Sequence, residues 1–316
     1  MSLIAIKSKL QKNKYGKIAI KIYHYCLAIP MSKIYQLKYN FSSKNYKQIK
    51  YYEDLDVFEM LISQKKSLCR FGDGEISWIY KDSKGYFGQE NSEELSEELK
   101  KVLLSNNDQI IIGIPRFFDE MVGYAEERKK SRDVHLAKYG KKWMALLDEK
   151  TIYADALITR VYMGRNDIDH GVYFKLWKQL WNDEDVIVIE GSETRFGVGN
   201  DLLDNAKTIR RILGPSENAF SKYQEIYSIA KATNKNSIIL IALGPTATVL
   251  SYYLALDGFQ AIDIGHLDIE YEWYKSKAVH KQPVKGKYVN EAGGSSNESI
   301  EDIDEKKYSS QIIYRC

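Results

Sequence analysis

The sequence predicts an α/β protein with a Rossmann-like, doubly wound and mainly parallel sheet. Apolar runs of strand length alternate along the chain with longer amphipathic segments, which is the order of elements in such folds. Several of the runs are continuous Ile, Val and Leu, as expected of strands buried on both faces of a parallel sheet. Short motifs rich in glycine and polar residues follow these runs, where the ligands of open α/β sheets bind.

The expected elements can be given by residue range. Strands are expected at 67–71, 109–115, 185–191, 237–244 and 261–265. Helices are expected at 92–104, 217–233 and 245–259, and within a long basic segment, 117–147, that we expect to hold more than one helix. A further helix is expected to carry Arg210 and Arg211.

The composition fits a globular protein of a reducing compartment. The 316 residues are 44% hydrophobic and 28% charged, which allows a substantial core. The three cysteines, Cys26, Cys69 and Cys316, lie far apart and form no CxxC pair. The sequence therefore predicts neither a disulfide framework nor a zinc site, and a cytoplasmic location is expected.

The chain divides into a basic N-terminal arm (1–50), a main domain (51–294) and a C-terminal tail (295–316). Eleven lysines and no acidic residue precede Glu53, whereas the body is acidic, which argues against nucleic-acid binding. The arm contains an apolar segment, 18–30, that is too short to span a bilayer. It is either a helical arm on the inner face of the plasma membrane or a basic helix packed on the domain or on a second subunit of a homo-oligomer. The acidic tail is expected to be flexible, as a linker or a lid.

A pair of carboxylates two residues apart follows the first expected strand. Asp73 and Glu75 lie in the motif Gly72-Asp73-Gly74-Glu75, which predicts a loop between a strand and a helix. Mg²⁺ and Mn²⁺ prefer oxygen ligands, and the glycines leave room for a diphosphate to approach the backbone. Arg70 could grip a phosphate or orient the carboxylates. The alternative is structural: Asp73 caps the helix and Glu75 lies in its first turn.

Two other expected strands end in motifs suited to phosphate or ribose. Gly244-Pro245-Thr246 would place backbone amides and a hydroxyl at the start of a helix, and Arg195 follows the strand that ends at Gly191. The glycine spacing matches neither the GxGxxG fingerprint of dinucleotide folds nor the P-loop, which disfavours NAD-dependent and P-loop chemistry. A tight turn between strand and helix is the alternative explanation of the first motif.

Acidic residues are densest just after the last expected strand. Asp263, His266, Asp268, Glu270 and Glu272 fall within ten residues. In a helix Asp268 and Glu272 would share a face and Glu270 would point elsewhere, whereas in an extended segment all three would share a face. Such a cluster can hold a base that activates a hydroxyl, and crowded carboxylates need a cation or a bound proton to relieve their repulsion. A lone histidine is more often a hydrogen-bonded structural residue.

Five stretches of the chain, in matching order between residues 51 and 294, resemble bacterial glycosyltransferases of the GT-D fold. These stretches are RFGDGE, VIEGSETRFGVGNDLLDNAKTIRRI, NAFSKYQEI, IALGPTATVLSYYLALDGFQAIDIGHLDIEYEW and YVNEAGG. The family was long described as a domain of unknown function. The resemblance implies metal-dependent transfer of a hexose, often glucose, from a UDP-sugar to an acceptor glycan of surface adhesins or other glycoconjugates.

The resemblance also implies roles for individual residues. Asp73 and Glu75 correspond to the family's DxE motif, and Mn²⁺ or Mg²⁺ is expected there with the donor's diphosphate. The base is expected in the acidic cluster, at Glu272 first, then at Asp268 or His266, in an inverting single displacement. The nucleotide-sugar is expected to contact residues near the strand ends, namely Arg70, Phe71, Gly72, Arg160, Glu190, Gly191, Arg195, Gly244, Pro245 and Thr246.

Two other functions stay open on the sequence. A metal-dependent phosphotransferase on a related sheet would use the same acids and arginines, and transfer of labelled phosphate rather than labelled sugar would identify it. A non-catalytic glycan- or nucleotide-binding module would suit the 24 tyrosines, but it would leave the acidic clusters without a use.

Overall fold

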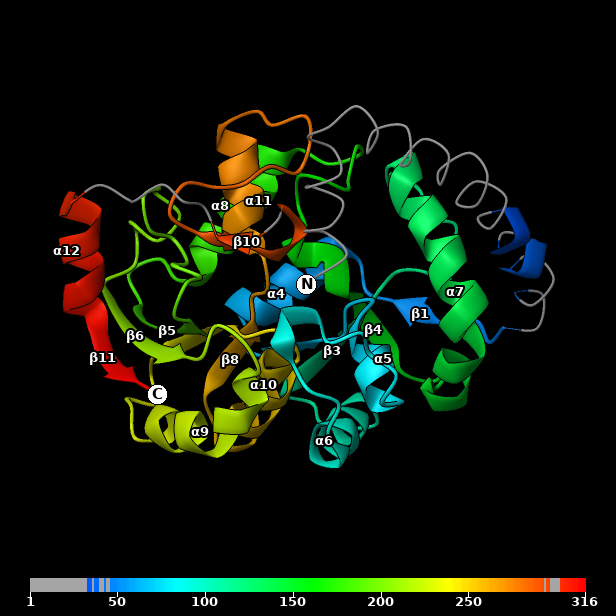
Figure 1. Ribbon diagram of the computed structural model, residues 1–316, viewed down its shortest axis with the longest axis horizontal. Helices are drawn as coiled ribbons and strands as arrows, with labels where there is room; N and C mark the ends of the chain where they lie inside the picture. The colour runs from blue at the N-terminus through cyan, green and yellow to red at the C-terminus, as the bar shows by residue number, and fades with distance from the viewer. Residues whose placement is uncertain (1–32, 36, 40–42, 44–45, 293, 296–301) are drawn as a thin grey trace, which may run out of the picture.

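A nine-stranded parallel sheet organises the computed structural model, which describes residues 33–35, 37–39, 43, 46–292, 294–295 and 302–316 (Figure 1). The strand order is β1-β4-β3-β2-β8-β7-β5-β6-β11, and every paired neighbour is parallel. The strands are β1 (Lys50–Tyr51), β2 (Ser67–Arg70), β3 (Ile110–Ile114), β4 (Ile152–Asp155), β5 (Asp185–Gly191), β6 (Thr208–Gly214), β7 (Ile238–Ala242), β8 (Gln260–Asp263) and β11 (Ile312–Arg315). A small antiparallel pair joins β9 (Tyr288–Val289) and β10 (Gly294–Ser295).

Helices cover both faces of this sheet (Figure 1). The helices are α4 (Asp54–Ile62), α5 (Glu75–Ile79), α6 (Glu93–Leu103), α7 (Glu126–Leu146), α8 (His170–Leu180), α9 (Tyr223–Lys231), α10 (Pro245–Leu256), α11 (Leu267–Lys275) and α12 (Asp302–Gln311). Short 3₁₀ segments are η3 (Tyr86–Gly88), η4 (Ala156–Thr159), η5 (Ala219–Lys222) and η6 (Asn290–Ala292).

Two hydrophobic cores lie on the two faces of the sheet. Helices α5, α6, α9 and α10 contribute to one core, and α4, α8 and α11 contribute to the other. Along β5, Ile187 and Ile189 enter the first core while Val186 and Val188 enter the second. Because successive strand residues point to opposite faces, a strand buried on both sides needs an apolar residue at every position. This confirms the doubly wound parallel sheet that the continuous apolar runs predicted.

All five expected strands are present, as β2, β3, β5, β7 and β8, and α6, α9 and α10 lie within the expected helical ranges. The expectation of more than one helix in 117–147 is wrong. A single helix, α7, begins at Glu126, because the chain before it turns through positive φ angles at Met121 and Gly123. There Tyr124 forms an antiparallel bridge with Arg165 instead of a helix.

The expectation of a helix at Arg210 and Arg211 is also wrong, since both lie on β6. This strand pairs in register with β5 over its whole length. Arg211 is 2% exposed, and its guanidinium Nη1 lies 2.7 Å from Glu190 Oε1 and donates to the carbonyl of Phe196. A buried arginine in a strand is tolerated here because a buried carboxylate from the neighbouring strand pairs with it.

The C-terminal tail is not a flexible linker over residues 302–315. Helix α12 places Tyr308, which is 3% exposed, against the Arg211 guanidinium, and Gln311 accepts a hydrogen bond from Arg211 Nε at 2.7 Å. Strand β11 then pairs with β6 as the edge of the sheet. The predicted domain boundary at 294 therefore separates segments that the sheet joins.

The N-terminal arm enters the sheet at its end. Strand β1 pairs with β4, and just before it Tyr46 and Lys47 contact α7 through the carbonyls of Leu136 (3.2 Å) and Leu147 (2.8 Å). The apolar segment 18–30, on which the membrane interpretation rests, lies outside the described residues. Within the part of the chain that the structure covers, none of the helices combines the length and apolar character needed to cross a bilayer.

The buried ion pair between Glu190 of β5 and Arg211 of β6 predicts that Arg211→Ala strongly destabilises the protein. The substitution leaves the Glu190 carboxylate buried without its cation, so we expect the free energy of unfolding to fall by about 3–5 kcal/mol. Chemical denaturation measures it, with Arg210→Ala as the matched control. Arg210 is the neighbouring, partly exposed residue of the same strand, and its loss should cost within about 0.5 kcal/mol. Equal losses in the two variants would contradict the prediction.

Candidate active site

The candidate site lies where the chain leaves two neighbouring strands, β2 and β8, toward opposite faces of the sheet. Strand β2 leads into α5, which packs in one core, and β8 leads into α11, which packs in the other. Open α/β sheets bind ligands at such a point, beyond the carboxyl ends of the strands. A cavity of about 600 Å³ opens here, which we call the central cavity. Its size is within the range of small-molecule sites.

Arg70, the last residue of β2, connects three strand ends. Its Nη2 lies 2.7 Å from Asp263 Oδ1, its Nε donates to the Asp263 carbonyl at 2.7 Å, and its Nη1 donates to the Ala156 carbonyl at 2.8 Å. The Thr248 hydroxyl donates to the Arg70 carbonyl at 2.7 Å. Gly265 makes room for this guanidinium, because a Cβ there would lie 2.0 Å from Nη2. Arg70 therefore orients the wall of the cavity, and its donors are largely committed.

The Gly72–Glu75 loop leads from β2 to α5 as predicted, with Asp73 and Glu75 both lining the central cavity. Gly74 occupies the cap position of α5 and no side chain caps the helix, so the capping role considered for Asp73 is absent. The Glu75 carboxylate folds back over Gly72, where a Cβ would lie 2.9 Å from its Oε2. Burial first, and then the Asp263 charge, raise the pKa of Glu75 to about 7.

These two carboxylates fit the chemistry of a divalent cation. The raised pKa of Glu75 reflects burial first and the nearby charges of Asp263 and Asp73 second, and a bound cation would favour the ionised carboxylate. In the portion of the chain that the structure describes, no three His, Cys, Asp or Glu side chains converge as a complete metal site. One or two protein carboxylates, completed by water and phosphate oxygens, are a common ligand set of Mg²⁺, and Asp73 and Glu75 match that number.

The acidic cluster after β8 is helical, so the first of the two alternatives holds. Asp268 and Glu272 share one face of α11 and meet the same two partners, Lys287 and Asn200. Lys287 Nζ lies 2.7 Å from Asp268 Oδ2 and 2.9 Å from Glu272 Oε1, and Asn200 Nδ2 donates to both carboxylates at 2.8 and 2.7 Å. Lys287 is buried. Asp268 lines the central cavity, whereas Glu272 does not.

Glu270 points to the other side of α11 and serves the loop after β4. It is fully buried, and its Oε2 accepts from the backbone amides of Tyr162 at 2.9 Å and Met163 at 2.7 Å. Its Oε1 lies 3.6 Å from Arg160 Nη1. Glu270 therefore holds the segment that carries Arg160, and has no place on the cavity wall.

Arg160 reaches the cavity beside a histidine and a second acid. Its Nη2 donates to Glu291 Oε1 at 2.6 Å and lies 3.2 Å from His266 Nδ1. Because a guanidinium only donates, Nδ1 accepts and the imidazole is neutral. Burial, together with Arg160, lowers the pKa of His266 to about 3. Glu291 also meets Lys281, 2.5 Å away, and the two cations hold its pKa below the usual range despite its burial.

The structure brings most of the predicted site residues together. Those that line the central cavity are Arg70, Gly72, Asp73, Glu75, Arg160, Gly191, Gly244, Pro245, His266 and Asp268. Those that do not are Phe71, Glu190, Arg195, Thr246 and Glu272. Three of the latter, Phe71, Glu190 and Thr246, are fully buried. Glu190 pairs with the arginine of β6, and Arg195 turns toward Glu305 at 3.2 Å.

Sequence reasoning missed the contribution of α7. Six of its residues line the cavity, and four of them are polar residues at helical spacing, namely Arg128, Ser131, His135 and Lys138. The pattern was readable, since these positions recur every three or four residues in a helix that has little apolar character. Trp143 donates to His135 Nε2 at 2.9 Å, and burial lowers the pKa of this histidine to about 4. Lys281 comes from the irregular segment after α11, which carried no comparable signal, whereas Glu291 lies on η6, within the YVNEAGG stretch of the family resemblance.

The chain is similar in sequence to known glycosyltransferases. A family model described as a glycosyltransferase GT-D fold matches residues 68–292. The chain is 35% identical over 257 residues to a probable glycosyl transferase Gly of Streptococcus gordonii, and 33% identical over 262 residues to the glycosyltransferase GlyD of Streptococcus pneumoniae serotype 4. These matches cover 81% and 82% of this chain but 37% and 32% of the relatives, so the chain spans about a third of the length of both.

Solved structures agree with the fold. One, described as a highly conserved domain of unknown function 1792 with a distinct glycosyltransferase fold, has a TM-score of 0.80 and 33% identity, over 88% of this chain and 99% of that one. A second, described as a new glycosyltransferase with this domain from Streptococcus sanguinis, has a TM-score of 0.78 and 33% identity, over 85% and 99% of the two chains. The resemblance read from the sequence motifs is confirmed.

The lowered pKa of His266 predicts an acid-dependent loss of stability. Below pH 6.5 the unfolded chain protonates this residue while the folded protein does not, so the free energy of unfolding falls as the pH falls toward 3. His266→Gln removes this contribution. Between pH 7.5 and 5 the variant should lose less stability than the wild type, by on the order of 1–2 kcal/mol. Urea titrations of both proteins at both pH values measure this difference in the free energy of unfolding. The contributions of the other histidines are the same in both proteins and cancel in the comparison. Equal losses would contradict the prediction.

Proposed function

The chain belongs to the glycosyltransferase GT-D fold family. We therefore propose that it transfers a hexose from a UDP-sugar to an acceptor glycan, with glucose as the first candidate for the hexose. We further propose that Mn²⁺ or Mg²⁺ assists the transfer. The observation that carries this is the pair Asp73 and Glu75, which faces the central cavity from a glycine loop beside the carboxyl end of β2. The glycosyltransferase class follows from the family, and the donor, the metal and the stereochemistry are our proposal.

The charges around the cavity support a nucleotide diphosphate as ligand. The cationic side chains that line it are Arg70, Lys84, Arg128, Lys138, Arg160 and Lys281. They balance the six carboxylates of the same lining, which are Asp73, Glu75, Asp82, Asp263, Asp268 and Glu291. Cations in a partly enclosed site attract and orient phosphate oxygens, and they stabilise charge that develops on a departing diphosphate. The start of α10 at Gly244 and Pro245 adds the positive end of a helix dipole to the same wall. The aromatic rings of Trp78, Tyr86 and Phe87 line the cavity as well and offer surfaces for a base or a sugar.

Asp73 and Glu75 would hold the metal ion. When bound, the ion supplies positive charge that offsets the charge on the nucleotide diphosphate as it leaves. Arg70 keeps the loop of these two acids in place through its contacts with Asp263 and Ala156. Neighbouring acids that are oriented in this way meet the ion without rearrangement, which is what preorganised sites require.

Asp268 is the base that the geometry favours over Glu272. Both carboxylates bind Lys287 and Asn200, but only Asp268 lines the cavity. Each of its two oxygens accepts one hydrogen bond, so the carboxylate is oriented before the acceptor arrives. His266 is neutral, and its Nδ1 faces Arg160, which leaves it a supporting role. Attack by an acceptor hydroxyl that loses its proton to Asp268 is a single displacement, which inverts the anomeric configuration.

The first experiment is calorimetric titration of UDP into the protein with Mn²⁺ and with EDTA. We expect binding that needs the metal, and we expect Asp73→Ala/Glu75→Ala to abolish it, because the oxygen ligands are lost. The matched control is Asp56→Ala/Glu59→Ala, which removes two exposed acids from α4 and should bind UDP normally. Binding that is indifferent to Mn²⁺ and to the double substitution would remove the metal from the mechanism.

The second experiment compares the two acids of α11. Asp268→Asn should lower kcat for hexose transfer by about 10²–10⁴-fold, the usual contribution of a general base, while Glu272→Gln should lower it much less. UDP affinity, measured by calorimetry, should stay within the wild-type range in both variants. Proton NMR of the product gives the anomeric configuration in the same reactions. A larger loss in Glu272→Gln, or a product that keeps the donor's configuration, would contradict this assignment.

A further inference from the structure

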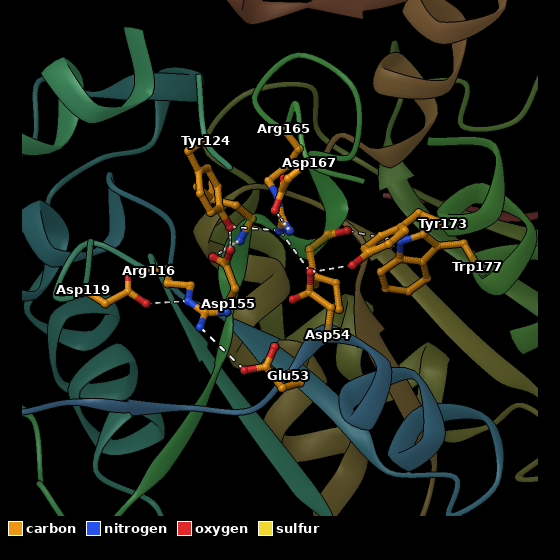
Figure 2. A network of polar contacts seen from close by, with 12 residues as sticks. Glu53, Asp54, Arg116, Asp119, Tyr124, Asp155, Arg165, Asp167, Tyr173 and Trp177 are labelled. Atoms are coloured by element: carbon orange, nitrogen blue, oxygen red, sulfur yellow. Dashed lines mark hydrogen bonds and ion pairs between the residues drawn. The ribbon is translucent and has the colours of Figure 1, made fainter. Parts of the chain in front are cut away.

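A second cavity, of about 660 Å³, opens beside the central cavity at the same edge of the sheet. Its walls come from residues that follow three strands: Glu53 and Asp54 after β1, Arg116 and Asp119 after β3, and Arg165 in the loop after β4. Figure 2 shows these side chains converging from separate segments. The carboxyl edge of the sheet therefore carries two cavities of similar size, and the proposed donor site uses one of them.

The guanidinium groups of the second cavity are already paired. Arg165 Nη1 lies 3.0 Å from Asp54 Oδ2, and Arg165 Nε lies 2.9 Å from Asp167 Oδ1 (Figure 2). Arg116 Nε lies 2.5 Å from Asp119 Oδ2. The carboxylates that line the cavity are Glu53, Asp54, Asp119, Glu120 and Asp167, which outnumber its two arginines. A phosphate would meet net negative charge here, so the chemistry favours a neutral or cationic ligand over an anionic one.

One polar atom in the wall lacks a partner. Asp54 is 6% exposed and lines the cavity, and its Oδ2 accepts from Arg165 and from the Tyr173 hydroxyl at 3.0 Å. Its Oδ1 is buried and has no hydrogen-bond partner within the described residues. A buried carboxylate oxygen without a hydrogen-bond donor is costly, and a ligand hydroxyl that displaces the side chains covering this oxygen would satisfy it. This oxygen lacks a hydrogen-bond donor, and an ionised phosphate group does not provide one.

Apolar side chains accompany these polar groups. Leu55 and Val122 line the second cavity and are 61% and 75% exposed, so they offer apolar surface at its mouth. Met121 and Ile168 also line it. Carboxylates and guanidinium groups that bind hydroxyls, set among apolar side chains that cover C–H faces, match a saccharide.

The two cavities share a wall. Backbone hydrogen bonds join Ala125 to Gly164 and Asn166 to Gly123, at 3.0 and 2.9 Å, between the residues before α7 and the loop after η4. On these paired segments Tyr124 and Arg165 line the second cavity, whereas Arg128 and Arg160 line the central one. A ligand of the second cavity would thus lie directly beside the site at which sugar transfer is proposed.

We propose that the second cavity binds a neutral saccharide, namely the part of the acceptor glycan that lies next to the hydroxyl under attack. This inference rests on the proposed glycosyltransferase reaction. In this arrangement the central cavity binds the nucleotide diphosphate and the second cavity binds the acceptor glycan, both at the carboxyl edge of the sheet. The Asp54 carboxylate accepts a hydrogen bond from a saccharide hydroxyl, and Leu55 and Val122 cover an apolar face of the sugar.

The test uses the full chain with UDP-glucose, Mn²⁺ and four disaccharide probes: lactose, maltose, cellobiose and chitobiose. Release of UDP at increasing probe concentration gives KM and kcat, and saturation-transfer NMR detects probe binding without turnover. Val122→Trp narrows the mouth of the second cavity at an exposed position. Asp54→Asn replaces the carboxylate in its wall with an amide, which is a weaker hydrogen-bond acceptor. The matched control is Val279→Trp, which changes a side chain that is 83% exposed and lines neither cavity.

We expect Val122→Trp to raise KM for the bound disaccharide about tenfold or more, because a blocked pocket loses most of its contacts. The UDP affinity and kcat at saturating probe should stay within about twofold of wild type, as should all parameters of Val279→Trp. Asp54→Asn should weaken binding of the same disaccharide, and we expect this even if the substitution also shifts the unfolding midpoint of the protein. Unchanged probe KM with normal UDP binding, or no probe bound by the wild type, overturns this inference alone.

Two further outcomes separate this inference from the proposed function. If Val122→Trp weakens UDP instead of the disaccharide, the second cavity belongs to the donor and the inference is wrong. If the wild type does not bind UDP at all, the proposed function fails, and saturation-transfer NMR on wild type and Val122→Trp still decides whether the second cavity binds a saccharide.

Discussion

The buried ion pair between Arg70 and Asp263 is the contact on which the candidate site depends. It connects the last residues of β2 and β8, the two strands from which the chain departs to opposite faces of the sheet. Burying two charges costs free energy that their attraction repays only in good geometry with further hydrogen bonds. Here Ala156 and Thr248 provide those bonds, and Gly265 leaves space for the guanidinium. The pair therefore acts by positioning three loops more than by adding stability.

Buried ion pairs recur wherever this protein joins segments that are far apart in sequence. Glu190 and Arg211 connect β5 to β6 and, through α12, to the C-terminal end of the chain. Lys287 connects the segment before β9 to the acids of α11. In each case a charge with no partner would be expensive, so each segment is held at one place. Many acids and arginines of this sequence consequently maintain the fold, and only a subset faces a ligand.

The parallel sheet explains why the functional groups collect at one edge. All nine strands run the same way, so the residues that follow them meet at a single border of the sheet. The centre of this border, near β2 and β8, faces a cavity lined by six arginine and lysine side chains and by six carboxylates. The part near β1, β3 and β4 has arginines that are neutralised by carboxylates. The second cavity thus has more carboxylates than arginines, whereas the two charges balance in the central one, and the reaction proposed above, with an anionic donor beside a neutral acceptor, would use this difference.

The sequence by itself determined the core of the fold and part of the site. Apolar runs of strand length identified β2, β3, β5, β7 and β8, and three of the runs are continuous because such strands are buried on both faces. The glycine loop predicted that Asp73 and Glu75 lie at the carboxyl end of β2, where they line the cavity. The sequence could not identify β4, β6 or β11, since these are short or charged and become strands only by pairing with a neighbour. Such pairing is tertiary, and local propensity is too weak to reveal it.

Tertiary structure alone decided which members of each motif reach the cavity. Helical spacing places Asp268 and Glu272 on one face of α11, yet only the packing of Lys287 and Asn200 beneath them shows that Asp268 lines the cavity. The same holds for Arg195, which a local pattern cannot tell from Arg160, because the ion pair with Glu305 that turns it aside comes from α12. Local periodicity sets the direction of a side chain relative to its own element, and only the packing of distant segments sets what lies in that direction.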